Sequence, residues 1–191
     1  MNRHGKSTRQ RLAAFGVAVL LAGRAIAFEH TAAVKDSAEV EARVKAAFIY
    51  NFARFVAWPA LSNAAPIRIG VMGQGDLSAP LEDVVRGKSV AGRAIRVAPV
   101  ANAAEAEFCE ILLIERSEST HFREIAQALA GKPVLTVSDD ESGSKEGIMI
   151  AFRLVDESVR FQINQEAAER AGLRISSQLL KVAISSKGRQ P

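Results

Sequence analysis

Cysteine and histidine are scarce in this 191-residue sequence, which has one cysteine, Cys109, and three histidines. A single cysteine cannot close an internal disulfide, so stability must come from packing. No pair of these residues has the spacing of a zinc site, and no G-x-S-x-G motif marks a serine nucleophile. We therefore expect no metal, no cofactor and no enzymatic activity. A hydrolytic activity that depends on His121 or Cys109 is the alternative, and Cys109 is expected either as a small buried residue or as a thiol that bridges a dimer or responds to redox conditions.

Long apolar runs are also lacking, apart from residues 12–22 near the start of the chain. This run is too short to span a bilayer, which takes roughly 20 apolar residues. Four basic residues precede it, and Ala25-Ile26-Ala27 follows it as an A-x-A cleavage site. The pattern predicts a signal peptide over residues 1–27 and a periplasmic, exported chain. An uncleaved anchor is the alternative.

The formal charge of +4 reflects 25 basic and 21 acidic side chains. The first 27 residues carry five of the basic side chains and none of the acidic ones, so their removal leaves 164 residues with 20 basic and 21 acidic side chains. The exported part therefore lacks the basic excess of a nucleic-acid-binding domain, and we expect no nucleic acid partner. Its length predicts one domain, residues 28–191, with 185–191 disordered.

Tryptophan and tyrosine occur once each, and both lie in the aromatic stretch from Val44 to Pro59. Its apolar residues recur at helical spacing, which predicts a helix from Ser37 to about Trp58 that ends before Pro59. The positions expected on the buried face are Val44, Ala47, Phe48, Phe52, Phe55 and Val56. Lys45, Asn51 and Arg54 are expected to project elsewhere. Tyr50 and Trp58 carry polar atoms that suit an interface or a pocket rim as well as a core.

The rest of the chain alternates between strands and helices. Strands are expected at 67–72, 94–97, 109–114 and 134–137, and helical segments at 77–85, 101–107 and 120–129. The apolar run 109–114 indicates burial on both faces, as in a parallel sheet covered by helices, whereas Arg93 and Arg96 are expected to face outward. A hairpin of 148–152 and 159–163 follows, and then two helices, 164–172 and 175–184. The fold class is therefore α/β, with a mostly parallel sheet, helices on both faces and a C-terminal antiparallel hairpin at one end.

Two polar segments are interpreted as connections. The Gly73–Asp76 turn follows a strand, as phosphate-binding loops do, but GxGD is far from the full dinucleotide fingerprint. We expect its glycines only to turn the chain. The acidic segment 138–147 lacks the spacing of a calcium loop, and we expect a solvated loop.

Four stretches, in this order after a signal peptide, resemble the YfiR family of periplasmic proteins. They are VKAAFIYNFARFVAWP (44–59), CEILLI (109–114), VLTVSD (134–139) and GIMIAF (147–152) continued by VRFQINQEAAERAGLRISSQLLKVA (159–183). The resemblance spans essentially the whole exported chain. Two departures stand out: Cys109 is alone where family members often have more cysteines, and Glu146 precedes Gly147 where many have two glycines.

The resemblance implies a dimeric α/β repressor that binds the periplasmic domain of an inner-membrane diguanylate cyclase. Release of the cyclase would raise cyclic di-GMP and promote biofilm formation, and an OmpA-like outer-membrane lipoprotein can take up the repressor. We expect contacts of this kind at Tyr50, Arg54, Phe55 and Trp58, with Arg160, Asn164 and Gln178 lining an adjoining surface or small anion pocket. Each residue also has a structural interpretation: Asn164 as a helix cap, Gln178 as a solvated or capping residue, and Arg160 as an outward strand residue.

A periplasmic small-ligand-binding protein without a cyclase target is the competing hypothesis. It rests on the α/β architecture, because clefts commonly form at the strand ends of such sheets.

Overall fold

The computed structural model describes residues 37–59 and 65–184. The chain divides into two compact units, residues 1–40 and 41–191. The first is described only over residues 37–40, which are helical, and all the described strands belong to the second. The predicted signal peptide and the predicted disordered tail lie outside the described residues. Among the described residues, no helix has the length and apolar character that crossing a bilayer requires.

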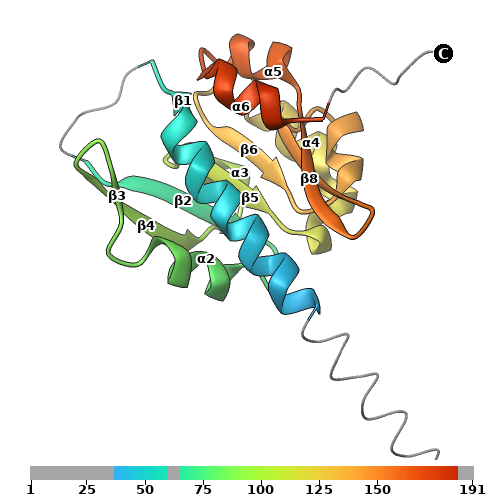
Figure 1. Ribbon diagram of the computed structural model, residues 1–191. Helices are drawn as coiled ribbons and strands as arrows, with labels where there is room; N and C mark the ends of the chain where they lie inside the picture. The colour runs from blue at the N-terminus through green and yellow to red at the C-terminus, as the bar shows by residue number, and fades with distance from the viewer. Residues whose placement is uncertain (1–36, 60–64, 185–191) are drawn as a thin grey trace, which may run out of the picture. The chain divides into compact units, whose positions relative to one another are not determined.

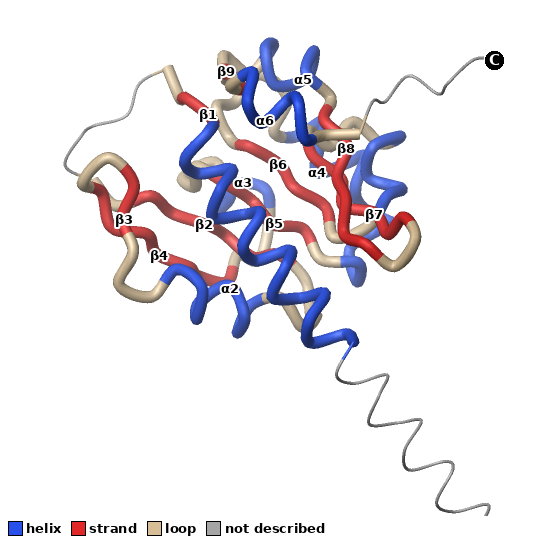
Figure 2. The backbone as a smooth tube through the Cα atoms, viewed as in Figure 1, coloured by secondary structure: helices blue, strands red, loops and turns tan. Residues whose placement is uncertain are grey.

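Within the described ranges, seven strands form one sheet in the order β3-β4-β2-β5-β6-β7-β8, as Figures 1 and 2 show. The five neighbours β4, β2, β5, β6 and β7 are parallel, whereas β3 and β8 pair antiparallel at the two ends. The strands are β2 (Ile67–Met72), β3 (Ser89–Val90), β4 (Arg93–Pro99), β5 (Ile111–Ile114), β6 (Leu135–Ser138), β7 (Ile150–Val155) and β8 (Ser158–Ile163). This confirms the predicted α/β class and the terminal hairpin.

Helices cover both faces of the sheet, and every side chain of β5 is therefore buried. Ile111 and Leu113 belong to one core cluster, and Leu112 and Ile114 belong to the other. The first cluster includes the N-terminal helix, described over residues 37–55. It also includes α2 (Ser78–Val85), α5 (Gln165–Arg170) and α6 (Ser177–Val182). The second includes α3 (Ala103–Ala106) and α4 (Phe122–Ala128). Short 3-10 helices η1 (Arg116–His121) and η2 (Glu141–Lys145) complete the connections.

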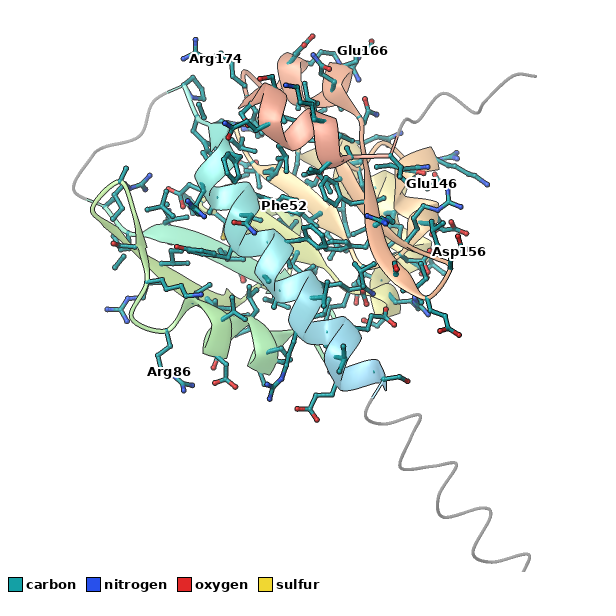
Figure 3. All side chains as sticks on the ribbon, in the orientation of Figure 1. Phe52, Arg86, Glu146, Asp156, Glu166 and Arg174 are labelled. Atoms are coloured by element: carbon teal, nitrogen blue, oxygen red, sulfur yellow. The ribbon has the colours of Figure 1, made fainter. Side chains whose placement is uncertain are left out.

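The aromatic core explains why two distant stretches of the sequence belong together. Phe52, labelled in Figure 3, belongs to the N-terminal helix and packs on the hairpin: its ring centroid lies 5.9 Å from that of Phe152 and 5.1 Å from that of Phe161. Phe48 packs on the same two rings. The helix ends at Phe55, earlier than predicted, because Val56 and Ala57 form β1 (Val56–Ala57), which pairs with β9 (Arg174–Ile175). The first and the last of the four stretches that resemble the YfiR family therefore build one core.

The buried face of the N-terminal helix is rotated from the predicted one. Val44 is 39% exposed and Ala47 is exposed, whereas Lys45 is buried together with Ala42, Ala46 and Ile49. Lys45 can occupy a buried position of the helix because carboxylates neutralise its charge. The prediction placed apolar residues inward and the charge outward, and the ion pair described below reverses it at this position.

Several further expectations differ from the structure. Arg93 does not face outward: it is 6% exposed, and its guanidinium donates to the Ala65 and Pro66 carbonyls and to Glu110 Oε1. Cys109 precedes β5 instead of opening it and is half-buried. The segment 138–147 is not a solvated loop, because Ser138 and Gly143 are buried and η2 occupies its second half. The last predicted helix is split into β9 and the shorter α6.

Candidate functional site

A cluster of two exposed cations and two half-buried rings is formed by the C-terminal half of the N-terminal helix and the turn between α2 and β3. The Arg54 guanidinium carbon lies 5.8 Å from the Tyr50 ring centroid and 5.4 Å from that of Phe55. Lys88, in the turn between α2 and β3, places its ammonium nitrogen 4.5 Å from the Tyr50 centroid. The attraction between a cation and the face of an aromatic ring holds these groups together while leaving the cations exposed to solvent. We call Tyr50, Arg54, Phe55 and Lys88 the cationic aromatic surface.

The positive charge of this surface is not neutralised within the described residues. Arg54 donates to Asn51 Oδ1, a neutral acceptor, at 3.3 Å, and neither Arg54 nor Lys88 has a carboxylate within ion-pair distance in the described part of the chain. In contrast, Arg86, close to Lys88 in sequence, pairs with Asp83 at 2.7 Å. Half-exposed rings next to unpaired cations are typical of a protein-binding hot spot, because aromatic residues and arginine contribute most of the binding energy at interfaces.

Trp58 is half-buried and belongs to the amino-terminal edge of the sheet. Its indole Nε1 donates to the Glu110 carbonyl at 3.1 Å, just before β5. The Glu110 carboxylate accepts from Arg68 N at 2.6 Å and from Arg93 Nη2 at 2.9 Å. The polar atom of Trp58 is therefore satisfied inside the protein, and only the rest of its ring is offered to a partner.

The three C-terminal candidates occupy separate places. Asn164 caps α5, because its Oδ1 accepts from Ala167 N at 3.0 Å, which confirms the predicted cap. Asn164 also lines a cavity of about 590 Å³ together with Gln162, Leu180 and other residues of β8, α5 and α6. Arg160 is an exposed strand residue opposite Arg153, and Gln178 is exposed on α6. That these residues adjoin the aromatic candidates stays a prediction.

The carboxyl ends of β2 and β5 form the crevice where sheets of this kind commonly bind ligands. The chain passes from β2 to β4 on one side and then returns to β5 on the other, so the strand order switches between β2 and β5. Such switch points are the usual ligand sites of doubly wound folds. The Gly73–Asp76 turn and Glu115 occupy this position, and we call it the carboxyl-edge crevice.

The side chain of Glu115 fills this crevice. Glu115 is 1% exposed, and its Oε1 accepts from Leu77 N at 3.2 Å at the start of α2. A Cβ atom added to Gly75 would collide with Glu115 Oε2, and one added to Gly73 would lie 2.5 Å from Ser117 Oγ. The glycines thus allow close packing of the protein's own side chains. Burial, together with the nearby charges of Asp139 and Asp76, raises the pKa of Glu115, although the Leu77 hydrogen bond opposes the shift.

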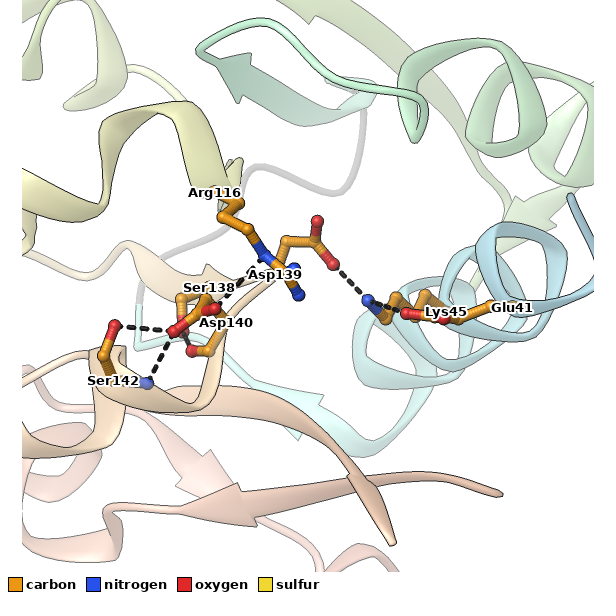
Figure 4. Close-up of polar contacts among 7 residues, drawn as sticks. All are labelled: Glu41, Lys45, Arg116, Ser138, Asp139, Asp140 and Ser142. Carbon is orange, nitrogen blue, oxygen red and sulfur yellow. Dashed lines mark hydrogen bonds and ion pairs between the residues drawn. The ribbon is translucent and has the colours of Figure 1, made fainter. Parts of the chain in front are cut away.

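An ion-pair network next to the crevice ties the N-terminal helix to the sheet (Figure 4). The Lys45 side chain is 5% exposed, and its Nζ pairs with Asp139, which follows β6, and with Glu41 Oε1 at 2.6 Å. Arg116 Nε lies 3.2 Å from Asp140 Oδ2, and Asp140 Oδ1 accepts from Ser142 N at 2.9 Å. Burial acts to raise the pKa of Asp140, but the hydrogen bonds from Ser142 and the charge of Arg116 outweigh it and lower that pKa.

The groups considered for catalysis are dispersed. His121 is exposed, and its Nδ1 lies 3.0 Å from Glu118 Oε2. The thiol of Cys109 packs against Gly70, and burial raises its pKa, which makes the reactive thiolate scarcer. Among the described residues, no group of three histidine, cysteine or acidic side chains could hold a metal ion.

Sequence reasoning missed Lys88, Lys45 and Glu115. Lys88 is distant in sequence from the aromatic stretch and reaches Tyr50 only through the fold. Lys45 was placed outward because a lone lysine in an apolar stretch is ordinarily solvated. Glu115 did carry one signal: it directly follows a strand that is buried on both faces, where side chains gather at the carboxyl edge of a parallel sheet.

Comparison with known proteins identifies the family. The sequence profile of the YfiR/HmsC-like family matches residues 42–184, about three quarters of the chain. No curated protein matches the sequence.

Solved structures show only a partial likeness. A conserved domain protein from Vibrio cholerae O1 biovar El Tor has 15% sequence identity and a TM-score of 0.47. An ABC domain in complex with L-Trp from Streptococcus pneumoniae has 10% identity and a TM-score of 0.45. In both cases, 62% of this chain and 54% of the other chain are covered, so the chain spans about half the length of these structures.

Members of the YfiR/HmsC-like family are periplasmic, non-catalytic regulators of cyclic di-GMP signalling that interact with the periplasmic domains of membrane diguanylate cyclases. The profile match covers the N-terminal helix from residue 42 onward, the whole sheet and α6. The chain therefore belongs to the YfiR/HmsC-like family.

Proposed function

We propose that this chain is an exported periplasmic repressor that binds the periplasmic domain of an inner-membrane diguanylate cyclase and holds the enzyme inactive. The observation that carries the proposal is the cationic aromatic surface. Its two half-buried rings and Arg54 stand on the helix of the family's aromatic stretch, and Lys88 reaches Tyr50 from the turn between α2 and β3. Trp58 extends the contact toward the amino-terminal edge of the sheet.

Repression requires only a difference in affinity. If the chain binds the inactive form of the cyclase more tightly than the active form, the equilibrium shifts by RT times the logarithm of the ratio of affinities. A tenfold preference corresponds to about 1.4 kcal/mol. No chemical step is needed, which agrees with a family of non-catalytic regulators and with the dispersed placement of His121 and Cys109.

The experiment combines binding with cyclase activity. The exported chain is titrated against membranes that contain a diguanylate cyclase encoded next to it, and both association and cyclic di-GMP synthesis are measured. We expect the wild-type chain to bind and to lower synthesis, and Trp58→Ala to fold normally and repress less. Arg170→Ala is the matched control, because Arg170 is exposed but paired with Glu166. A Trp58→Ala chain that represses as fully as the wild type would remove the aromatic anchor from the proposal.

Two further partnerships implied by the family resemblance belong to this proposal. A homodimer would be detected as twice the chain mass in light scattering. An OmpA-like outer-membrane lipoprotein would compete with the cyclase for the chain and restore cyclic di-GMP synthesis when added. Arg160 and Gln178 are exposed and can take part in either contact, and we propose them as secondary positions.

A small-ligand-binding function is the second candidate, and the cavity lined by Asn164 favours it. The volume of about 590 Å³ lies in the range of small-molecule sites. The carboxyl-edge crevice is a weaker ligand site, because the buried Glu115 side chain fills it. A transporter gene beside this one, together with thermal stabilisation of the chain by a small metabolite but not by the cyclase domain, would favour this second function.

A further inference from the structure

Two arginines leave the same side of the sheet from neighbouring strands. Arg68 in β2 and Arg96 in β4 are register partners in a parallel pair. Adjacent strands lie about 4.8 Å apart, and partners in register point to the same face. Both residues are exposed. The two arginine side chains therefore leave one face of the sheet at neighbouring positions and are both exposed to solvent.

This face of β4 is not covered by a helix. Gly70, two residues after Arg68 and thus on the same side, faces Val100 and Cys109. It therefore shares the side of the core cluster that α3 and α4 cover over β5. Farther out on that side, Ala94 and Ala98 of β4 are exposed. The small alanine side chains leave flat, open sheet beside the two arginines.

An exposed ring adjoins the arginines. Phe108 is 66% exposed, the highest value among the large apolar side chains that the structure describes. The Arg68 guanidinium carbon lies 5.9 Å from its ring centroid. Phe108 follows α3, and nothing in its own packing requires an aromatic residue there, because most of its ring is in solvent.

The charge of the pair is not neutralised within residues 37–59 and 65–184. Glu110 is close, but both of its carboxylate oxygens are engaged, one by the Arg68 backbone N–H and the other by Arg93. Glu107 pairs with Lys132 at 3.1 Å. By contrast, eight other lysine and arginine side chains among the described residues form an ion pair with a carboxylate. Like charges on adjacent strands are destabilising, so this uncompensated pair costs stability in the free protein.

We propose that Arg68, Arg96 and Phe108 form a second docking surface, for an acidic segment of a protein partner. One carboxylate of the segment bridges the two guanidinium groups, and a neighbouring apolar side chain packs on the Phe108 ring. Paired guanidiniums suit a planar carboxylate because they present parallel N–H donors. The surface lies across the sheet from the N-terminal helix, so it is distinct from the cationic aromatic surface and does not depend on the proposed repression.

The test uses a fluorescently labelled hexapeptide, acetyl-Glu-Glu-Phe-Leu-Glu-Glu-amide, titrated into the full exported chain at low salt. The matched peptide carries Gln at every Glu position. We expect the acidic peptide to bind with an affinity that falls steeply as salt rises, and the Gln peptide to bind at least tenfold more weakly. Arg68→Gln, Arg96→Gln and Phe108→Ser should each weaken the acidic peptide at least fivefold. Arg86→Gln, at an exposed but paired arginine, should not.

A second measurement guards against variants that merely misfold. Arg96→Gln should raise the melting temperature at low salt, and the gain should shrink in high salt, because it removes the repulsion with Arg68. Equal peptide affinity for wild type and variants would overturn the proposal. So would binding to phosphatidylglycerol vesicles at concentrations where the peptide does not bind, since that would assign the surface to a membrane. Arg54→Ala should leave peptide binding unchanged, which separates this surface from the one proposed for the cyclase.

Discussion

The carboxyl-edge crevice and the cationic aromatic surface differ in how their polar and charged groups are satisfied. In the crevice, Glu115 contacts the start of α2, Ser117 Oγ accepts from Gln74 N at 2.8 Å, and Lys45 pairs with Asp139. On the aromatic surface, Arg54 and Lys88 meet only rings and an amide. The place where related architectures bind ligands is thus filled by the protein's own side chains, although Glu115 Oε2 is buried there without a hydrogen-bond partner among the described residues. The unpaired cations lie elsewhere, on the aromatic surface.

This contrast has a thermodynamic meaning. Groups that satisfy one another inside a protein contribute to its stability, and removing one leaves the other buried and unpaired. Groups that are unsatisfied at the surface contribute little to stability and remain available to a partner. Changes in the crevice should therefore cost stability without affecting partner binding, and changes on the aromatic surface should do the reverse.

The largest effect is expected at Lys45. Lys45→Ala leaves Asp139 partly buried without its cation, and loss of one partner of such a pair costs about 3–5 kcal/mol. Urea unfolding followed by circular dichroism measures the change. Lys132→Ala is the control: its pair with Glu107 is exposed, so the cost should stay below about 1 kcal/mol. Equal costs for both variants would mean that the Lys45 network does not anchor the helix.

A smaller effect of the opposite kind is expected at Tyr50. Tyr50→Ala removes the ring that lies under both Arg54 and Lys88. It should weaken cyclase binding by about 2 kcal/mol, the usual size of an aromatic hot spot, with a much smaller change in unfolding free energy. Isothermal titration with the cyclase periplasmic domain measures it. If Tyr50→Ala lowers stability but not binding, Tyr50 supports the fold, as the crevice residues do, and is not part of the binding surface.

Asn164→Ala should cost about 1 kcal/mol of stability, because it removes the side chain that caps α5. Asn164→Asp keeps an accepting oxygen and should restore most of that stability, as urea unfolding can measure. If Asn164→Ala also weakens the binding of a partner or ligand while Asn164→Asp does not, the residue has a second role at the neighbouring cavity.

The smallest effect is a change in pH dependence at Glu115. Its pKa is raised in the folded protein, so the folded state holds the proton more tightly than the unfolded state. The stabilising contribution is complete below the unfolded pKa, near 4.5, and is lost as pH rises through the folded pKa. Glu115→Gln should flatten this part of the curve of melting temperature against pH. A curve that keeps its slope would place the titrating group elsewhere.

Much of the fold could be predicted because its signals are local. The run 109–114 indicated burial on both faces, and its last four residues, which form β5, are buried throughout. The hairpin and the Asn164 cap were likewise visible in alternation and capping chemistry. The strands β1 and β9 were not, because two-residue strands carry no periodic pattern and exist only through their pairing.

The candidate site was predicted only in part. Tyr50, Arg54 and Phe55 share a surface because they lie close together in one helix, which helical spacing could indicate. Lys88 and the register of Arg68 with Arg96 depend on how separate segments pack, and no local pattern reports that. Arg93 was assigned outward because an isolated arginine in a strand is ordinarily solvated, but Glu110 and two carbonyl groups receive it inside.

The sequence by itself determined the order of the longer strands and helices, the parallel sheet and the aromatic helix, since each follows from periodicity and turn chemistry within a short window. Only the tertiary structure decided which charges are buried and which are left open. The free energy of a charged group depends on the partners that distant segments bring within a few ångströms. Lys45 and Arg93 found such partners in this fold, whereas Arg54, Lys88 and Arg68 did not.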